Sequence, residues 1–196
     1  GYDFKVNEDV LIPRPETEEL VGLVLSLYDD KFSDKENVQV FDVATGSGAI
    51  GISLNLEEPK LNVICTDISK AALEVASENN QKLGAHVNFL CGNMLDPLID
   101  RQLKCDILVC NPPYIPSEET MEHSVVDYEP HVALFGGEDG LKFYRDVFEK
   151  AHLVLNPNAF LAFEMGFNQG QALTKLGKEY FPDAIITVHK DMSGKD

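Results

Sequence analysis

The fold expected for the whole chain follows from the stretch Asp42-Val43-Ala44-Thr45-Gly46-Ser47-Gly48-Ala49-Ile50-Gly51. It begins at the end of an apolar run and leads into residues with a helical pattern, which predicts a strand, a tight turn and a helix. Its glycines have the spacing G-x-G-x-x-G, which lets the backbone turn sharply and approach a ligand. Asp67 stands 21 residues after the first of these glycines, at the end of the next apolar run.

Apolar runs of strand length recur along the chain and alternate with helical patterns. Several are almost continuously apolar, which is typical of strands buried on both faces of a parallel sheet. Because the chain stops soon after the sixth run, we expect the last edge strand of the sheet to be missing from this sequence. The predicted strands are Val38–Val43, Leu61–Asp67, Val87–Cys91, Cys105–Cys110, Ala159–Met165 and Ala184–Lys190.

Three of the intervening segments carry clear helix signals. The first begins at Pro15, a residue favoured in the first helical turn, and keeps one apolar face over residues 20–28. The second starts after Ser69, whose side chain can cap it, and can end in the left-handed conformation at Gly84. The third has its apolar face between residues 141 and 155. The alternation predicts an α/β fold with a doubly wound, mostly parallel, Rossmann-like sheet.

Composition and charge exclude some classes of partner. The 196 residues are 44% hydrophobic and 25% charged, which is ordinary for one globular domain. Sixteen Lys and Arg residues stand against 33 Asp and Glu residues, which gives a net charge of -17. Since no two basic residues are adjacent, we expect neither nucleic acid nor an anionic membrane surface to be a partner.

No targeting or metal signal is present in the sequence. No run approaches the ~18 apolar residues of a membrane span, and the first residues lack the apolar core of a signal peptide. The cysteines form no Cys-x-x-Cys pair, and each lies in or beside an apolar run. We therefore expect a cytoplasmic protein without a metal site, with reduced and buried thiols at Cys65, Cys91, Cys105 and Cys110.

The glycine stretch has two functional interpretations. With Asp67 as an acceptor for ribose hydroxyls, it satisfies the dinucleotide fingerprint of a nicotinamide-dependent oxidoreductase. Asp42, four residues before the first glycine, favours a ligand with a cationic amino-acid tail, and S-adenosylmethionine has an ammonium and a sulfonium group. The simpler alternative is that Asp42 caps the turn that follows it.

Asn111-Pro112-Pro113-Tyr114 closes the fourth predicted strand, at the same sheet edge as the glycine turn. Methylation of a planar amide or amino nitrogen requires a site that holds both N–H groups and directs the nitrogen at the methyl carbon. The Asn111 side-chain oxygen and the Pro112 carbonyl can supply the two acceptors, and consecutive prolines stiffen their geometry. The Tyr114 ring offers a flat wall for the substrate group. The alternative is a proline-rich strand exit with a locally bonded asparagine.

The segment that follows is long and proline-rich. Residues 111–135 show no periodicity and follow a strand end, where α/β sheets bind ligands, so we expect an active-site flap. Its part Ser117–Glu129 has five carboxylates and no Lys or Arg. A third hypothesis, a non-enzymatic module with a basic partner, would use this acidic stretch.

The whole pattern resembles the HemK-type protein-glutamine N5-methyltransferases, from about Phe4 to Gly194. Asn-Pro-Pro-Tyr is shared with adenine-N6 and guanine-N2 methyltransferases of nucleic acids, which remain the main alternative. The other motifs are more specific to the family. The motifs that carry the resemblance are Val10–Glu18, Thr45–Ile50, Asn111–Tyr114, Glu129–Leu134, Gly136–Leu141 and Glu164–Gly166 with Gln169.

The resemblance implies an activity and a set of site residues. The family transfers a methyl group from S-adenosylmethionine to the glutamine of the Gly-Gly-Gln motif in class 1 peptide-chain release factors, and releases S-adenosylhomocysteine. The resemblance implies catalytic roles for Asn111, Pro112 and Tyr114. It also implies that the target amide is held by Asn111, Pro112, Pro113 and Tyr114. The implied cofactor contacts are Ala44, Thr45, Gly46, Ser47, Gly48, Asp67, Asn93, Met94 and Asn111.

The chain departs from the family's usual residues at two positions, and the resemblance also implies a domain division. The family usually has glycine at the position of Ala44 and often an aromatic residue at that of Met94. We expect residues 1–35 to form a lead-in segment with one helix and residues 36–196 to form the methyltransferase core, without the family's small helical N-terminal domain. The motifs leave open the roles of four polar residues, Arg14, Glu16, His131 and Glu164.

Overall fold

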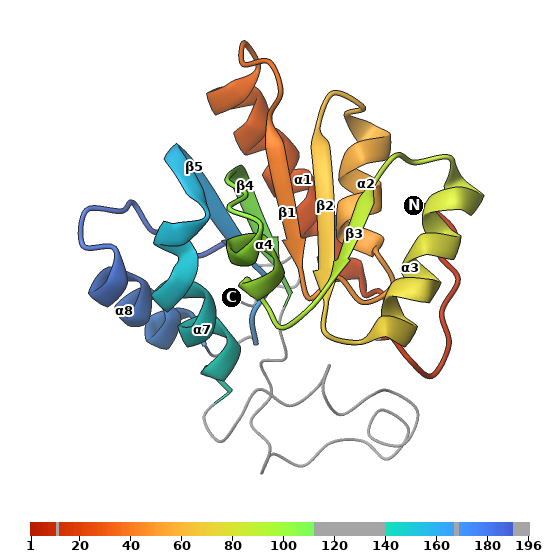
Figure 1. The fold of residues 1–196 in the computed structure, drawn as a ribbon. Coiled ribbons are helices and arrows are strands. Elements are labelled where there is room, and N and C mark those ends of the chain that lie inside the picture. The colour runs from red at the N-terminus through yellow and green to blue at the C-terminus, as the bar shows by residue number, and fades with distance from the viewer. Residues whose placement is uncertain (11, 112–139, 167–168, 190–196) are drawn as a thin grey trace.

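The computed structural model describes residues 1–10, 12–111, 140–166 and 169–189. Its centre is a five-stranded sheet in the order β3-β2-β1-β4-β5, and every neighbouring pair is parallel (Figure 1). This confirms the expected doubly wound architecture. The strands are β1 (Gln39–Val43), β2 (Asn62–Asp67), β3 (Asn88–Cys91), β4 (Cys105–Cys110) and β5 (Leu155–Phe163).

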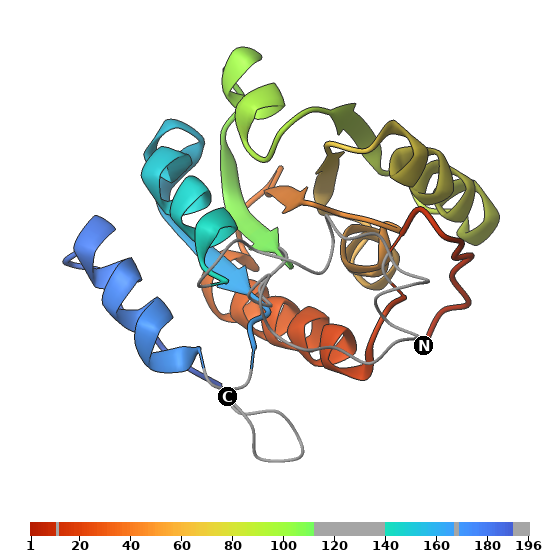
Figure 2. The ribbon, with the colours of Figure 1, turned by 90° about the horizontal axis from the view of Figure 1, so that it is seen from below.

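Helices cover both faces of the sheet (Figure 2). Helices α1 and α2 share one apolar cluster with the sheet, and α4 and α7 contribute to a second cluster that also includes residues of β1 and β4. Helix α8 packs beside α7. The helices are α1 (Pro15–Phe32), α2 (Ala49–Glu57), α3 (Lys70–Leu83), α4 (Asp96–Asp100), α7 (Lys142–Lys150) and α8 (Gly170–Tyr180), with a 3-10 turn at Ala151–Leu153.

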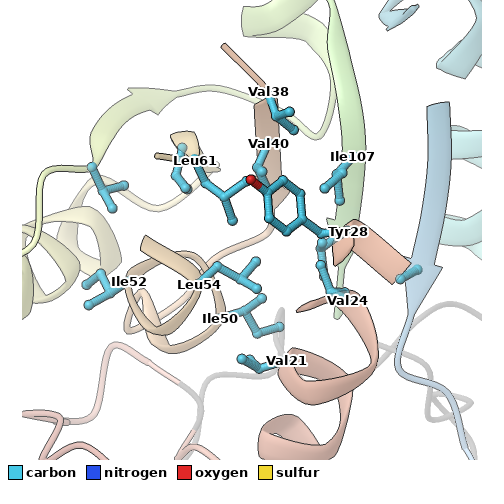
Figure 3. Close-up of a cluster of buried hydrophobic side chains, with 14 of the residues drawn as sticks. Val21, Val24, Tyr28, Val38, Val40, Ile50, Ile52, Leu54, Leu61 and Ile107 are labelled. Atoms are coloured by element: carbon cyan, nitrogen blue, oxygen red, sulfur yellow. The ribbon is translucent and has the colours of Figure 1, made fainter. Parts of the chain in front are cut away.

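The larger apolar cluster fixes the sheet against α1 and α2. Figure 3 shows Val24 and Tyr28 of α1 pointing toward Val40 of β1 and Ile107 of β4. All six residues of β4 are buried, as expected for a central strand with helices on both sides. Packing of these buried strands fixes the positions of the carboxyl ends of β1 and β4, and the residues of the site follow directly after these ends.

Local sequence signals account for the ends of α3. The Ser69 hydroxyl accepts a hydrogen bond from the Ala72 N–H at 3.1 Å, and Gly84 ends the helix with φ 73°. Both features agree with the sequence prediction, because serine satisfies a free N–H at the start of a helix and glycine adopts the left-handed conformation at its end.

Several sequence predictions were wrong. Residues 184–189 form no strand, and Ile185 in that segment is 96% exposed; an apolar run forms a strand only when a neighbour pairs with it. Leu155 begins β5 instead of extending the α7 helix. Cys91 is exposed at the end of the edge strand β3, whereas the other three cysteines are buried as expected, and all four are free. Residues 112–135 of the predicted flap, which begins at residue 111, lie outside the described residues.

No helix among the described residues combines the length and the apolar character that crossing a membrane requires.

Candidate active site

A cavity of about 330 Å³ lies at the carboxyl ends of β1, β2 and β4. Strand β1 pairs with β2 on one side and β4 on the other, so the chain changes direction across the sheet here. Doubly wound sheets bind their ligands at such a switch point. The volume lies in the range of small-molecule sites, about 300–1,000 Å³.

The glycine turn between β1 and α2 forms the floor of the cavity. Ala44, Gly46 and Gly48 have φ values of 58°, 59° and 86°, so three residues of this short turn are in the left-handed region. A Cβ on Gly48 would lie 2.6 Å from Ile52 Cδ1 and 3.2 Å from Ala76 Cβ, so this position accepts only glycine without rearrangement. Of the two glycines with positive φ, Gly46 lines the cavity and presents main chain there without a side chain.

Asp42 holds this turn in place from below. Its Oδ2 accepts hydrogen bonds from the Thr45 hydroxyl at 2.5 Å and from the Gly51 N–H at 2.9 Å. The side chain is fully buried, and this burial raises the pKa of Asp42 to about 6, although the hydrogen bonds act in the opposite direction. Asp42 is not among the residues that line the cavity. The bonds of Oδ2 therefore support the capping interpretation of Asp42, while its Oδ1 is buried without a hydrogen-bond partner among the described residues.

Asp67 ends β2 and joins the glycine turn to the start of α3. Its Oδ2 accepts from the Gly46 N–H and its Oδ1 from the Ser69 N–H, both at 2.9 Å. Burial raises the pKa of Asp67, and the N–H groups of Ser69 and Gly46 act against that rise. Each carboxylate oxygen has a second lone pair. At the cavity wall these lone pairs can accept the two hydroxyls of a ribose.

The turn between β3 and α4 supplies another wall. Met94 has a left-handed φ of 47°, and its carbonyl accepts a hydrogen bond from the Thr66 hydroxyl at 3.3 Å. Asn93 and Met94 both line the cavity, the first exposed and the second 8% exposed. A flat apolar group can lie against the Met94 side chain while Asn93 faces its polar edge.

Asn111 follows the last residue of β4 and lines the cavity opposite Asp67 along the sheet edge. Its side-chain oxygen is buried and has no hydrogen-bond partner among the residues that the structure describes. An unpaired buried acceptor costs about 1–3 kcal/mol. A substrate N–H group at this position would satisfy it.

Glu164 comes directly after β5, next to Asn111 in the parallel register that pairs Cys110 with Phe163. Its N–H donates to the Cys110 carbonyl at 3.3 Å, and its Oε2 accepts from the Thr17 hydroxyl at 3.3 Å. Burial raises the pKa of Glu164 to about 7, and Glu16 raises it further, while the Thr17 bond and Arg14 lower it. The carboxyl group thus supports Thr17, which itself lines the cavity.

Most of the predicted cofactor residues meet at this one cavity. The exception is Gly48, which does not line it and serves as the N-terminal cap residue of α2. Pro112, Pro113, Tyr114 and His131 lie outside the described residues. The residues that the structure brings to the cavity are Ala44, Thr45, Gly46, Ser47, Asp67, Asn93, Met94 and Asn111.

Two parts of the cavity wall were not predicted from the sequence. The lead-in segment contributes Asp9, Val10, Ile12, Pro13 and Thr17, and the start of α7 contributes Lys142 and Phe143. Arg14 and Glu16, the residues of the opening motif whose role was left open, do not line the cavity. The motif Val10–Glu18 carried the signal, but its sequence does not show which of its residues face inward.

Within the described parts of the chain, no group of three or more His, Cys, Asp or Glu side chains is placed to hold a metal ion.

Nicotinamide-dependent oxidoreductases and class I S-adenosylmethionine-dependent methyltransferases share a parallel sheet with a glycine turn and an acidic strand end around one cavity, and similarity to known proteins identifies this chain with the second class. Residues 24–128 match the family described as methyltransferase small domain. The fold of the chain is also similar to that of a methyltransferase from Pyrococcus furiosus, with a TM-score of 0.63 at 15% identity over 90% of this chain and 77% of that one. A 16S rRNA N2 G1207 methyltransferase of T. thermophilus, solved with AdoMet and guanosine, gives a TM-score of 0.60 at 17% identity, over 87% of this chain and 39% of that one.

Closer relatives define the family. Over 198 aligned residues, the chain is 48% identical to the release factor glutamine methyltransferase of Bacillus subtilis (strain 168), covering 100% of this chain and 69% of that protein. It is 43% identical to the protein of the same name from Enterococcus faecalis, again over 100% of this chain and 69% of the relative. The chain therefore belongs to the release factor glutamine methyltransferase family.

Proposed function

We propose that the protein transfers a methyl group from S-adenosylmethionine to the side-chain nitrogen, N5, of the glutamine in the Gly-Gly-Gln motif of class 1 release factors. The names of its relatives support a release factor as the substrate. The observation that carries the chemistry is the buried oxygen of Asn111, which lies at the cavity without a partner among the described residues. Such an oxygen suits an amide N–H donor.

The residues of the cavity fit the proposed cofactor. The main chain of the glycine turn, from Ala44 to Gly46, would receive its amino-acid portion, and the Asp67 carboxylate would accept its ribose hydroxyls. Asn93 and Met94 would receive the adenine. When bound, the cofactor supplies an electrophilic methyl group on a sulfonium centre.

The proposed role of Asn111 is to orient the target amide. Its side-chain oxygen would accept one N–H of the glutamine, and the Pro112 carbonyl would accept the other, with Pro113 stiffening the loop and Tyr114 stacking on the amide plane. Orientation of this kind can contribute roughly 7–11 kcal/mol to a reaction between two bound groups. Acceptors placed where positive charge develops on nitrogen add electrostatic stabilisation.

The transfer balances without a strong base. The bound cofactor would supply the methyl carbon to the glutamine nitrogen and keep the electron pair of its carbon–sulfur bond, and the nitrogen would lose one proton to solvent. The Asn111 oxygen stabilises the charge on nitrogen until that proton leaves. The chain therefore needs to hold and aim the amide, which is what an uncharged acceptor can do.

The second candidate is methylation of an amino group on a nucleic-acid base, which the Asn-Pro-Pro-Tyr motif would also serve. The net charge of -17 disfavours it, because a phosphate backbone would be repelled.

The test is the transfer of labelled methyl from S-adenosylmethionine to a purified class 1 release factor, with duplex DNA as a parallel acceptor. We expect label on the release factor, in a peptide that contains Gly-Gly-Gln, and none on DNA. Label on DNA and none on the protein would overturn the proposal.

A further inference from the structure

The first part of the lead-in segment, residues 3–10, lies along one face of α3, as Figures 1 and 2 both show. Near the carboxyl end of the helix, Asp3 pairs with Lys82 at 3.1 Å. At the other end of the segment, Val10 is 1% exposed and packs with Ala72 and Val75. The segment thus follows α3 from its carboxyl end toward its amino end and arrives at the cavity, which Val10 and Ala72 both line.

Asn79 is the polar link in the middle of this contact. Its Oδ1 accepts from the Lys5 N–H at 2.6 Å, and its Nδ2 donates to the Lys5 carbonyl at 2.9 Å. The same Nδ2 donates to the Ser47 carbonyl in the glycine turn, also at 2.9 Å. The side chain is fully buried, so its three hydrogen bonds are made without competition from water.

Asn79 therefore contacts two segments that both reach the same cavity. Ser47 belongs to the floor that the glycine turn forms, and Asp9 and Val10 belong to the wall that the lead-in segment forms. The side-chain pairs that the start of the lead-in segment makes are exposed, namely Lys5 with Glu78, Asp3 with Lys82 and Tyr2 with Glu57. Exposed ion pairs of this kind contribute about 0–1 kcal/mol to the free energy of unfolding.

We propose that Asn79 is a positioning residue that couples docking of the lead-in segment to cofactor binding through its shared bonds to Lys5 and Ser47. A ligand that fixes the glycine turn fixes the Ser47 carbonyl, and with it the Asn79 amide that holds Lys5. By linkage, docking of the segment raises cofactor affinity by the same factor by which the cofactor stabilises the docked segment. The inference rests on the proposed function, because it places S-adenosylmethionine in this cavity.

Hydrogen exchange of the full chain tests the coupling. The amide to follow is that of Lys5, because it bonds to Asn79 and Lys5 does not line the cavity, so its protection does not come from ligand contact. We expect saturating S-adenosylmethionine to slow its exchange about tenfold, within the 5–150-fold range of typical couplings. Binding measured by calorimetry with no change at Lys5 would overturn the coupling and leave the proposed function standing. Absence of binding would overturn both.

Asn79→Ala with a matched control separates coupling from simple loss of stability. Asn55 is 5% exposed and bonds to the Leu61 carbonyl and the His86 N–H, away from the lead-in segment. We expect Asn79→Ala to weaken S-adenosylmethionine binding about tenfold and to abolish the response of the Lys5 amide. Asn55→Ala should keep that response. Equal affinity and an equal Lys5 response in both variants would overturn the proposal.

A second variant keeps the test open if Asn79→Ala does not fold. Lys5→Pro removes the N–H that donates to Asn79 and changes no buried side chain, since Lys5 is exposed. We expect it to weaken S-adenosylmethionine binding in the same direction, and unchanged affinity would overturn the coupling.

Discussion

Replacement of Glu164 by glutamine should make the protein more stable at neutral and alkaline pH. Burial raises the pKa of Glu164 to about 7 from an ordinary value of 4.5; the charges of Glu16 and Glu19 add to the rise, and the Thr17 hydrogen bond and Arg14 oppose it. Below pH 4.5 the carboxyl is protonated in both the folded and the unfolded chain. Between pH 4.5 and 7 only the folded chain retains the proton, so this group makes stability fall as the pH rises.

The size of the effect follows from the two pKa values. Their separation corresponds to about 3 kcal/mol of unfolding free energy, lost in full above pH 7. Glutamine is uncharged at every pH and keeps an oxygen that can accept the Thr17 hydroxyl. We therefore expect Glu164→Gln to match the natural protein near pH 4 and to exceed its stability above pH 7 by up to about 3 kcal/mol.

Urea unfolding, followed by circular dichroism from pH 4 to 8, measures this difference. The buried carboxyl of Asp42 is common to both proteins, so its contribution cancels. Glu74→Gln, the same chemical change at an exposed position of α3, is the matched control and should show no such pH dependence. A constant difference between Glu164→Gln and the natural protein across this range would refute the assignment of a raised pKa to Glu164.

Three further predictions concern the cavity. Asp67→Ala should weaken S-adenosylmethionine binding by about 2 kcal/mol, because hydrogen bonds to a charged group are lost; a calorimetric titration with unchanged affinity would mean that the ribose lies elsewhere. Ala44→Gly should raise the stability of the cofactor-free protein by about 1 kcal/mol in urea unfolding, because Ala44 has a φ of 58°, and equal or lower stability would contradict this explanation. Asn111→Ala should lower methyl transfer at least 10²-fold in a labelled-methyl assay while cofactor affinity stays within about tenfold. Retained turnover would remove the proposed role of its side-chain oxygen.

Signals that lie close together in the sequence predicted much of the fold. Ser69 and Gly84 marked the ends of α3 because helix caps depend on neighbouring residues. The glycine turn and Asp67 were correctly predicted to meet, since parallel strands bring their carboxyl ends to one edge of the sheet. The run Ala184–Lys190 was wrongly predicted to be a strand, because periodicity does not reveal whether a partner strand is present.

Contacts between distant segments could not be predicted in the same way. Thr17 and Glu164 are 147 residues apart, and Lys5 and Asn79 are 74 residues apart. The first contact depends on how α1 packs on the sheet, and the second on how the lead-in segment lies along α3. The role of Asp42 was ambiguous for a related reason, because a buried acid at a strand end can serve either its own turn or a ligand.

The proposed function depends most directly on which atom receives the methyl group. The decisive measurement is fragmentation mass spectrometry of the Gly-Gly-Gln peptide from a release factor incubated with the protein and S-adenosylmethionine. We predict one added methyl on the glutamine side-chain nitrogen, and its loss when Asn111→Ala replaces the natural protein. A methyl group on another residue, or the same modification with Asn111→Ala at an undiminished rate, would contradict the account.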